Sequence, residues 1–397
     1  MRLVHLADLH LGFRQYQRLT PTGINQREAD VARAFQRAVD RIIELRPDIV
    51  LVAGDIFHSV RPTNPAIVHA FRQFSRLREG VPDARIVVIA GNHDTPRAVE
   101  AGGILGLFLE LGIHVAASAP RRFQFPDQDL EIFAVPSNMA PDVVLRPSGE
   151  AKHSVLLLHE EIEGVLPRLT WRAEQFAHEL PLAALNSEEW SYVALGHYHV
   201  YRRVAERTYY SGALDYTSNN VWGELAEERA QRLAGKGFIE HDLETGAHTF
   251  HVLETARAVV DLPPVQARGM TAPELDVAVR EAVEACAGGI DGRIVRLTVF
   301  DAPRHIARGL DHRALREYRR RALHFHLDVR RPEVIRTQAA SGAPGRRASL
   351  AELVRDSLRS RHIDRDVDRD ELVALGLRYL RDAEAAESPL LVEQEAE

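Results

Sequence analysis

The chain has 397 residues and a formal net charge of −7, a length that allows two or three domains with a sizeable core. Its one cysteine, Cys286, excludes disulfides within the chain and zinc sites built from cysteines. The first residues run directly into a predicted strand, and no apolar run approaches 18 residues. We therefore expect no signal peptide, no membrane span and a cytoplasmic location.

The amino-terminal part of the chain alternates between strand and helix patterns. Apolar runs predict buried strands at 3–7, 49–53 and 86–90, and apolar residues at helical spacing predict helices over 25–46 and 65–77. This order implies a parallel sheet. Further strands are predicted at 113–116, 130–135, 155–158, 192–195, 201–204 and 237–242.

Five of these apolar runs lead at once into Asp, Asn or His. The segments are Asp8-Leu9-His10, Gly54-Asp55, Gly91-Asn92-His93-Asp94, His159 and Gly196-His197-Tyr198-His199. Open α/β sheets bind ligands outside the carboxyl ends of their strands, so we expect these side chains to meet there. A helix cap could explain Asp8 alone, but it does not predict a histidine two residues later.

The residue types indicate a pair of metal ions. Mixed oxygen and nitrogen ligation without thiolates suits Mn²⁺, Fe²⁺ or Zn²⁺. Seven ligands can hold two ions if one carboxylate bridges them, and Asp55 is the natural bridge because it lies between the first and last segments. Two ions about 3.5–4 Å apart can clamp the oxygens of a displacement at phosphorus and supply hydroxide near neutral pH. The candidate ligands are Asp8, His10, Asp55, Asn92, His159, His197 and His199.

The ordered pattern D-x-H, G-D, G-N-H-D, H, G-H-x-H over residues 1–255 resembles the calcineurin-like metallophosphoesterase superfamily. The resemblance implies an α/β fold of two packed mixed β-sheets flanked by helices, with two divalent ions, expected to be Mn²⁺. It gives His93 the role of stabilising the transition state or protonating the leaving oxygen. One ion would be held by Asp8, His10, Asp55 and His199, and the other by Asp55, Asn92, His159 and His197.

A narrower resemblance lies in Gly54-Asp55-Ile56-Phe57-His58-Ser59-Val60-Arg61-Pro62, with Leu9-His10-Leu11-Gly12 and Tyr210-Ser211-Gly212. These strings are similar to the SbcD-like nuclease subunits of double-strand-break repair complexes, and the YhaO-like exonuclease branch is a close alternative. The resemblance implies an exonuclease and endonuclease that acts on duplex ends and single strands of DNA. It also implies a homodimer, an SbcC-like ATPase partner with a coiled coil, and a place for His58 near the scissile phosphate. Taken alone, His58 also has a less favoured explanation as an ordinary surface-loop histidine.

A second, smaller domain is predicted over 256–337, with Pro263-Pro264 at the joint. Helices are expected at 273–287 and 310–322 and strands at 294–300 and 323–329. Residues 304–347 contain 12 arginines and 4 acidic residues, a net of +8, which indicates a polyanionic partner. The less favoured alternative is a solvated helix face in an arginine-rich chain. The resemblance implies a capping domain that guides DNA to the metals.

The carboxyl-terminal part is predicted to be a flexible linker over 338–349, a helical partner-binding tail over 350–384 and an acidic disordered tail over 385–397. The helical tail contains two apolar stripes. It either folds back on the capping domain or docks on a partner, which the resemblance implies is the coiled coil of the ATPase.

Three classes of function fit these observations. The first is a metal-dependent DNA nuclease that works with an ATPase. The second is a small-substrate metallophosphoesterase, a phosphatase or cyclic-nucleotide phosphodiesterase, which would share the metal site but would not need a basic second domain. The third is a non-catalytic DNA-end scaffold, which the intact ligand set argues against.

Overall fold

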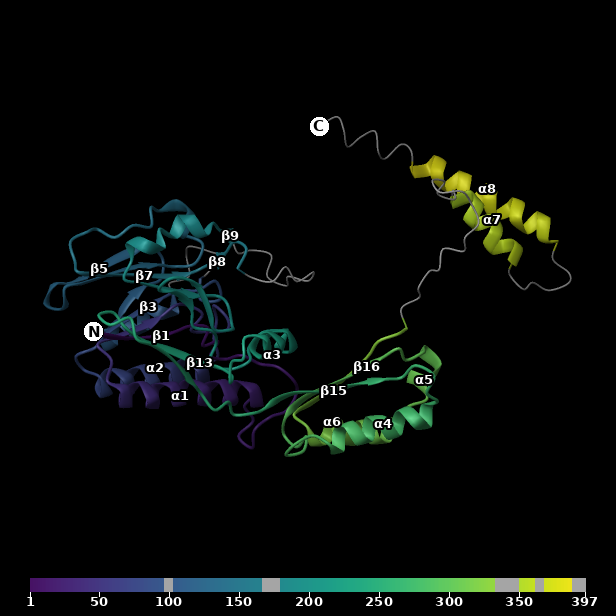
Figure 1. The fold of residues 1–397 in the computed structure, drawn as a ribbon, viewed down its shortest axis with the longest axis horizontal. Helices are drawn as coiled ribbons and strands as arrows, with labels where there is room; N and C mark the ends of the chain where they lie inside the picture. The colour runs from purple at the N-terminus through teal and green to yellow at the C-terminus, as the bar shows by residue number, and fades with distance from the viewer. Residues whose placement is uncertain (96–102, 166–178, 333–349, 361–367, 388–397) are drawn as a thin grey trace. The chain divides into compact units, whose positions relative to one another are not determined.

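The computed structural model describes residues 1–95, 103–165, 179–332, 350–360 and 368–387 (Figure 1). The chain divides into two units, Met1–Pro332 and Glu333–Glu397. Among the described residues, no helix combines the length and the apolar character that crossing a membrane requires.

The first large sheet has six strands in the order β14-β13-β1-β2-β3-β4. The four strands β1 to β4 run parallel, as the alternation of strands and helices predicts, whereas β13 and β14 pair antiparallel. The bounds are β1 (Arg2–Leu6), β2 (Ile49–Val52), β3 (Arg85–Ile89), β4 (His114–Ala116), β13 (Gly237–Asp242) and β14 (His248–Val252).

The second large sheet also has six strands, in the order β11-β12-β10-β7-β6-β5. Its four inner strands are parallel and its two edge strands antiparallel, so both large sheets are mixed, as predicted. The bounds are β5 (Arg121–Phe125), β6 (Leu130–Val135), β7 (His153–His159), β10 (Tyr192–Gly196), β11 (Arg202–Ala205) and β12 (Thr208–Tyr210). The short strands β8 (Glu161–Ile162) and β9 (Glu179–Leu180) pair with each other.

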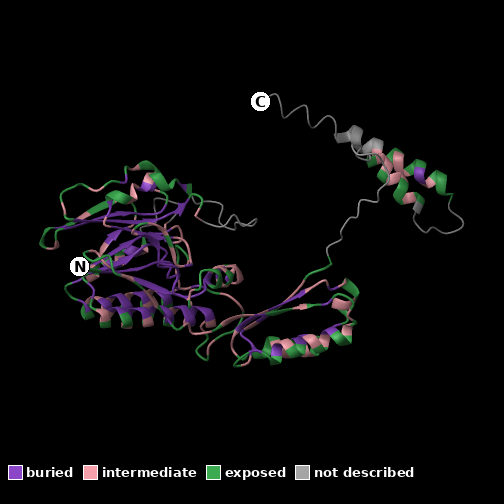
Figure 2. Cartoon of the chain, viewed as in Figure 1, coloured by how far each residue is buried: buried purple, intermediate pink, exposed green. Residues whose placement is uncertain are grey.

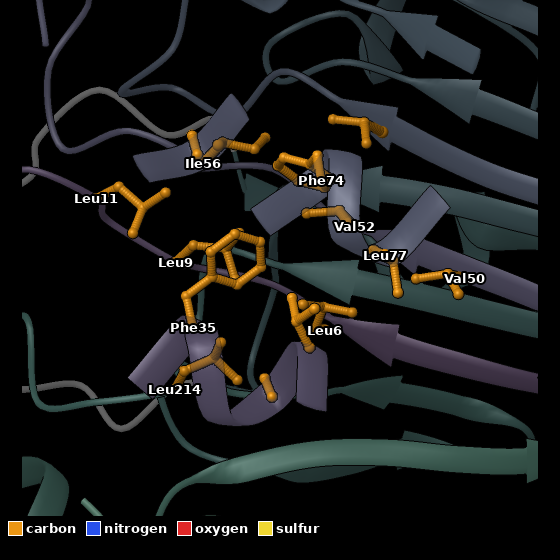
Figure 3. Packing of buried hydrophobic residues seen from close by; sticks show 14 of the residues in the cluster. Leu6, Leu9, Leu11, Phe35, Val50, Val52, Ile56, Phe74, Leu77 and Leu214 are labelled. Carbon is orange, nitrogen blue, oxygen red and sulfur yellow. The ribbon is translucent and has the colours of Figure 1, made fainter. Parts of the chain in front are cut away.

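Alternating side chains of the first sheet are buried on opposite faces. Leu6 and Val52 pack with Phe35 and Phe74 on the face covered by helices (Figure 3), whereas Leu51 packs into the core shared with the second sheet. The strands of the two large sheets are mostly buried (Figure 2). Strands buried on both faces read as nearly continuous apolar runs, with His5 of β1 as a buried polar exception. The two covering helices are α1 (Gln26–Leu45) and α2 (Asn64–Gly80).

The helix boundaries follow from their caps. The Asn25 side chain accepts a hydrogen bond from the backbone N–H of Arg27 at the start of α1. Thr63 caps α2 in the same way, with Pro65 in the first turn. A further helix, α3 (Val221–Ala230), begins after the capping residue Asn220, and the apolar spacing does not predict it.

A third sheet of three parallel strands has its own hydrophobic cluster, which includes Leu275, Leu297 and Phe325. Pro263 and Pro264, expected at the joint, lie within its edge strand β15, where the pairing register shifts. The elements are β15 (Val259–Gln266), β16 (Ile294–Phe300), β17 (His324–Val329), α4 (Ala272–Glu284), α5 (Arg304–Arg308) and α6 (His312–Arg321).

The second unit contains two helices, α7 (Leu350–Ser360) and α8 (Arg369–Glu387), which pack on each other. Gly376 of α8 faces Leu358 and Val354 of α7, because a Cβ at this position would press against Leu358. The predicted linker at 338–349 lies outside the described residues, as do 388–397 of the acidic tail. The domain boundaries drawn from the sequence remain a prediction.

Candidate metal centre

The seven predicted ligands all lie at or just beyond the carboxyl ends of five strands. Asp8 and His10 follow β1, Asp55 follows β2, and Asn92 follows β3 in the first sheet. In the second sheet His159 ends β7, while His197 and His199 follow β10. Because the two sheets pack face to face, their ligand-bearing ends come together.

One group of donor atoms lies around His10. Its Nε2 is 3.0 Å from Nε2 of His199 and 3.7 Å from Oδ2 of Asp55. Donor atoms of Asp8, His10 and His199 all lie within 4.8 Å of one another. Two imidazole nitrogens that face each other at 3.0 Å need a proton or a cation between them. This group contains the side chains predicted for the first ion.

A second group lies around Asn92. Its Oδ1 is 3.0 Å from Nε2 of His159 and 3.2 Å from Nδ1 of His197. Nε2 of His159 is also 3.4 Å from Oδ2 of Asp55. The same carboxylate oxygen of Asp55 therefore lies between the two groups, which is the position that a bridging ligand needs.

The spacing of these donor atoms fits divalent ions. Nitrogen and carboxylate ligands lie about 2.0–2.2 Å from an ion such as Zn²⁺, so neighbouring ligand atoms around one ion are roughly 3.0–3.6 Å apart. The distances within the two groups run from 3.0 to 3.7 Å. The oxygen and nitrogen donor set, with no sulfur, also suits Mn²⁺.

The backbone at the ligands adopts conformations that ordinary residues rarely take. Asp8, His10, Asp55 and His197 have φ angles of 53°, 44°, 52° and 100°. Non-glycine residues in this region carry strain and cluster at functional sites, where the surrounding structure enforces the conformation. The strands thus end in sharp turns that aim these side chains at one place.

The glycines before the ligands have a steric role. A Cβ on Gly91 would overlap the carboxylate and backbone N of Asp55, and a Cβ on Gly54 would overlap the ring of His159. A Cβ on Gly196 would overlap the carbonyl of Ala53. The glycines in the G-D, G-N-H-D and G-H-x-H strings therefore make room for the ligands.

The ionisable groups at the centre shift one another's pKa values. Burial raises the pKa of Asp8 to about 6 and lowers the pKa of His10 well below its usual range. Burial opposes the charge of Asp55 too, but His159 and His10 outweigh it and hold the Asp55 pKa well below its usual value. Likewise, Asp55 overcomes the effect of burial on His159 and raises its pKa to about 10. Metal ligands must be deprotonated, so an ion bound here would displace the proton of His159.

His93 and His58 lie beside the first group of donor atoms. The backbone N–H of His93 donates to Oδ1 of Asp55 at 2.9 Å, and its Nδ1 is 2.8 Å from the carbonyl oxygen of His58. The two rings stack with centroids 5.1 Å apart, and the His93 ring meets His10 edge-on at 4.9 Å. Nδ1 of His58 is 3.4 Å from Nδ1 of His10. Both predicted catalytic histidines are therefore brought to the centre.

The match to known families agrees with this geometry. The family model of the calcineurin-like phosphoesterases matches residues 1–201 of the 397. The chain belongs to the calcineurin-like phosphoesterase family.

Relatives of this phosphoesterase include repair proteins. It is 30% identical over 254 residues to the DNA double-strand break repair protein Mre11 of Methanocaldococcus jannaschii, across 60% of this chain and 61% of that protein. Identity to Mre11 of Methanococcus maripaludis is 28% over 254 residues, across 61% of this chain and 63% of that protein. Identity to Mre11 of Sulfurisphaera tokodaii is 32% over 209 residues, across 51% of this chain and 49% of that protein. The matches thus span about half to three fifths of the length of these relatives.

Three residues of the phosphoesterase centre have no role predicted from the sequence. The carboxylate of Asp94 accepts from the backbone N–H groups of Ile56, Phe57 and Gly91, and so ties the β2 loop to the β3 loop. Its place in the Gly91-Asn92-His93-Asp94 string was the available signal. Glu224 and Lys236 lie beside His199. No local pattern marks them, since they come from segments remote in sequence from the ligands.

Proposed function

We propose that the chain is a metal-dependent DNA nuclease that hydrolyses phosphodiester bonds at DNA ends during double-strand-break repair. The observation that carries the proposal is the position of one Asp55 oxygen between two groups of donor atoms. The 30% identity to an archaeal double-strand break repair protein supports DNA as the substrate.

In this proposal the seven ligands hold two Mn²⁺ ions, with Asp55 shared. Asp8, His10 and His199 complete the first site, and Asn92, His159 and His197 complete the second. Two such ions lower the pKa of a bound water and neutralise charge that develops on the phosphoryl oxygens. The chain's own contribution is to fix the ligands on strained turns, so that little reorganisation is needed.

His93 supplies a proton in this proposal. Its Nδ1 lies against the carbonyl of His58, so Nδ1 carries the hydrogen and the ring is held in one orientation. A protonated His93 keeps that bond and offers its Nε2–H to the leaving oxygen. General acid catalysis of this kind contributes about 10²–10⁴-fold. His58, through its contacts with His93 and His10, would lie close to the scissile phosphate.

The arginines of helix α6 support the proposal that the substrate is a polyanion. Among the described residues Arg320 pairs with Glu317 and Arg321 with Asp291, while no ion pair is found there for Arg313, Arg316 or Arg319. We propose that this surface of the predicted capping domain contacts the DNA backbone. Binding would then weaken steeply with salt, because each phosphate contact releases counterions.

The exposed apolar side chains of the helix pair α7 and α8 support the proposal that a partner protein binds there. Leu350, Leu353, Leu375 and Tyr379 stay between 38% and 66% exposed although the two helices pack on each other. We propose that this apolar surface docks on the coiled coil of an SbcC-like ATPase, an amphipathic helix in a groove being a common mode of recognition. A homodimer and a cytoplasmic location complete the proposal.

The test uses labelled duplex, hairpin and single-stranded DNA with Mn²⁺, with and without a chelator. Cleavage that the chelator abolishes is expected. Hydrolysis of a small phosphodiester without cleavage of DNA would support the small-substrate alternative, and DNA binding without any hydrolysis would support the scaffold.

His93→Ala should retain bound Mn²⁺ and DNA affinity but lose about 10²–10⁴-fold in turnover, because the proposed role is exercised only in the transition state. His251→Ala, on β14 and away from the ligands, serves as the control and should leave turnover unchanged. Loss of Mn²⁺ from the His93 variant, measured by elemental analysis, would make His93 a ligand instead.

A further inference from the structure

A buried polar network lies behind the ligand His199. Oε1 of Glu224, on helix α3, is 3.4 Å from Nδ1 of His199, the ring nitrogen opposite the one that faces His10. The Glu224 side chain is 9% exposed and that of Lys236 is 1% exposed. Nδ1 of His199 and Oε1 of Glu224 have no other hydrogen-bond partner among the described residues. Buried polar atoms are rarely left unpaired, so each is the natural partner of the other.

Lys236 fixes the position of Glu224. Its ammonium group pairs with the second oxygen of Glu224, lies 2.9 Å from Oε1 of Glu228, and donates to the backbone carbonyl of His199 at 2.7 Å. Tyr216 donates to the other oxygen of Glu228 at 2.6 Å, and its ring lies under the ammonium group. The network therefore touches His199 twice, at its ring nitrogen and at its backbone.

The sequence gives an independent reason to single out this lysine. The chain has 50 basic residues, of which Lys152 and Lys236 are the two lysines. An ammonium group is a compact charge with three donors, whereas a guanidinium is a planar fork. Lys236 has three oxygen atoms around a single nitrogen, from Glu224, Glu228 and the His199 carbonyl, at a position with almost no exposed surface. That geometry suits lysine and not the arginine that the chain uses nearly everywhere else.

We propose that Glu224 and Lys236 are positioning residues for His199, which orient its ring so that Nε2 faces the metal centre. The inference rests on the proposed role of His199 as a ligand. A carboxylate that accepts the Nδ1 proton leaves the lone pair on Nε2, which is the form that binds a metal ion. At 3.4 Å the pair is longer than a formed N–H···O bond of about 2.7–3.2 Å, and a small rotation of either side chain completes it.

An ordinary structural ion pair is the competing explanation. A structural pair would support folding and leave the folded protein's affinity for metal unchanged. A positioning pair would change the affinity at one ion only, the one that His199 is proposed to hold. Partners of metal-bound histidines typically change metal affinity by about 10–100-fold when removed.

The experiment measures Mn²⁺ binding to the full chain by calorimetry after chelator treatment. Wild type is expected to bind two ions. Glu224→Ala should weaken one of them by about 10–100-fold and leave the other unchanged. Glu224→Gln keeps an oxygen that can accept the Nδ1 hydrogen and preserves the shape of the buried network, so it should lose less affinity and guards against a folding defect. His199→Ala should weaken the same ion.

Glu227→Gln is the matched control. It removes a negative charge from the same helix, at a side chain that contacts Arg202 and Tyr198 and not a ligand. It should leave both ions in place. If Glu224→Ala binds both ions as tightly as this control, or only lowers the melting temperature in chelator, the positioning role is wrong. If wild type binds no Mn²⁺, the proposed metal centre itself fails, which is a distinguishable result.

Discussion

The buried histidine His5 makes a quantitative prediction about stability in acid. It lies in β1 and is fully buried between the two large sheets, with its Nδ1 3.1 Å from the hydroxyl of Tyr192 on β10. Burial lowers the pKa of His5 to about 3. The perturbation is the double substitution His5→Phe with Tyr192→Phe, which replaces both hydrogen-bonding partners by apolar rings and removes the titrating group.

The sign follows from proton uptake. An unfolded histidine has a pKa of about 6.5, above the folded value, so below pH 6.5 the unfolded chain binds a proton that the folded chain does not. The free energy of unfolding therefore falls as the pH drops from about 6.5 towards about 3. At about 1.4 kcal/mol for each pH unit, the loss between pH 7.5 and pH 5 is about 2 kcal/mol from this residue alone.

The assay is denaturant unfolding in chelator at pH 7.5 and pH 5 for wild type, Tyr192→Phe and the double variant. The acid loss of wild type should exceed that of the double variant by about 2 kcal/mol, while Tyr192→Phe should keep the wild-type loss. Other titrating groups are common to the three proteins and cancel in the difference. An equal acid loss in wild type and the double variant would refute the reasoning.

Three further predictions concern the centre and the tail. Asp55→Ala should abolish cleavage because it removes the carboxylate whose oxygen lies between the two groups of donor atoms. Two Mn²⁺ ions per variant chain, by elemental analysis, would contradict this. Gly91→Ala should reduce turnover by about 10²-fold, since its Cβ displaces the carboxylate of Asp55, and unchanged kinetics would show that the site tolerates the shift. Truncation after Gln338 should leave Mn²⁺-dependent cleavage of short single strands intact, because every predicted ligand precedes residue 200, and should eliminate binding to a coiled-coil ATPase. Undiminished co-purification with that partner would place the docking surface elsewhere.

Local patterns in the sequence were sufficient to predict the fold class, and they also singled out the seven candidate ligands that the structure brings close together. Strands such as β1 and β2 are buried on both faces, so apart from His5 their inner positions read as apolar runs, and Asp8 and Asp55 follow where these runs end. The helices α1 and α2 were predicted for a related reason, since one apolar face packs on the sheet. In both cases the pattern of apolar residues nearby in the sequence predicts which side chains are buried.

Only the tertiary structure decided which remote residues contact the candidate ligands. Glu224 lies in helix α3 and Lys236 directly precedes strand β13, both more than 20 residues after His199 in the chain. The sequences of these two segments carry no periodic signal for the contact with His199. The steric need for Gly91 likewise depends on Asp55, which belongs to a neighbouring strand. Such contacts form only when the two sheets and α3 have packed, because a hydrogen bond or a steric exclusion between distant segments leaves no period in the sequence of either one.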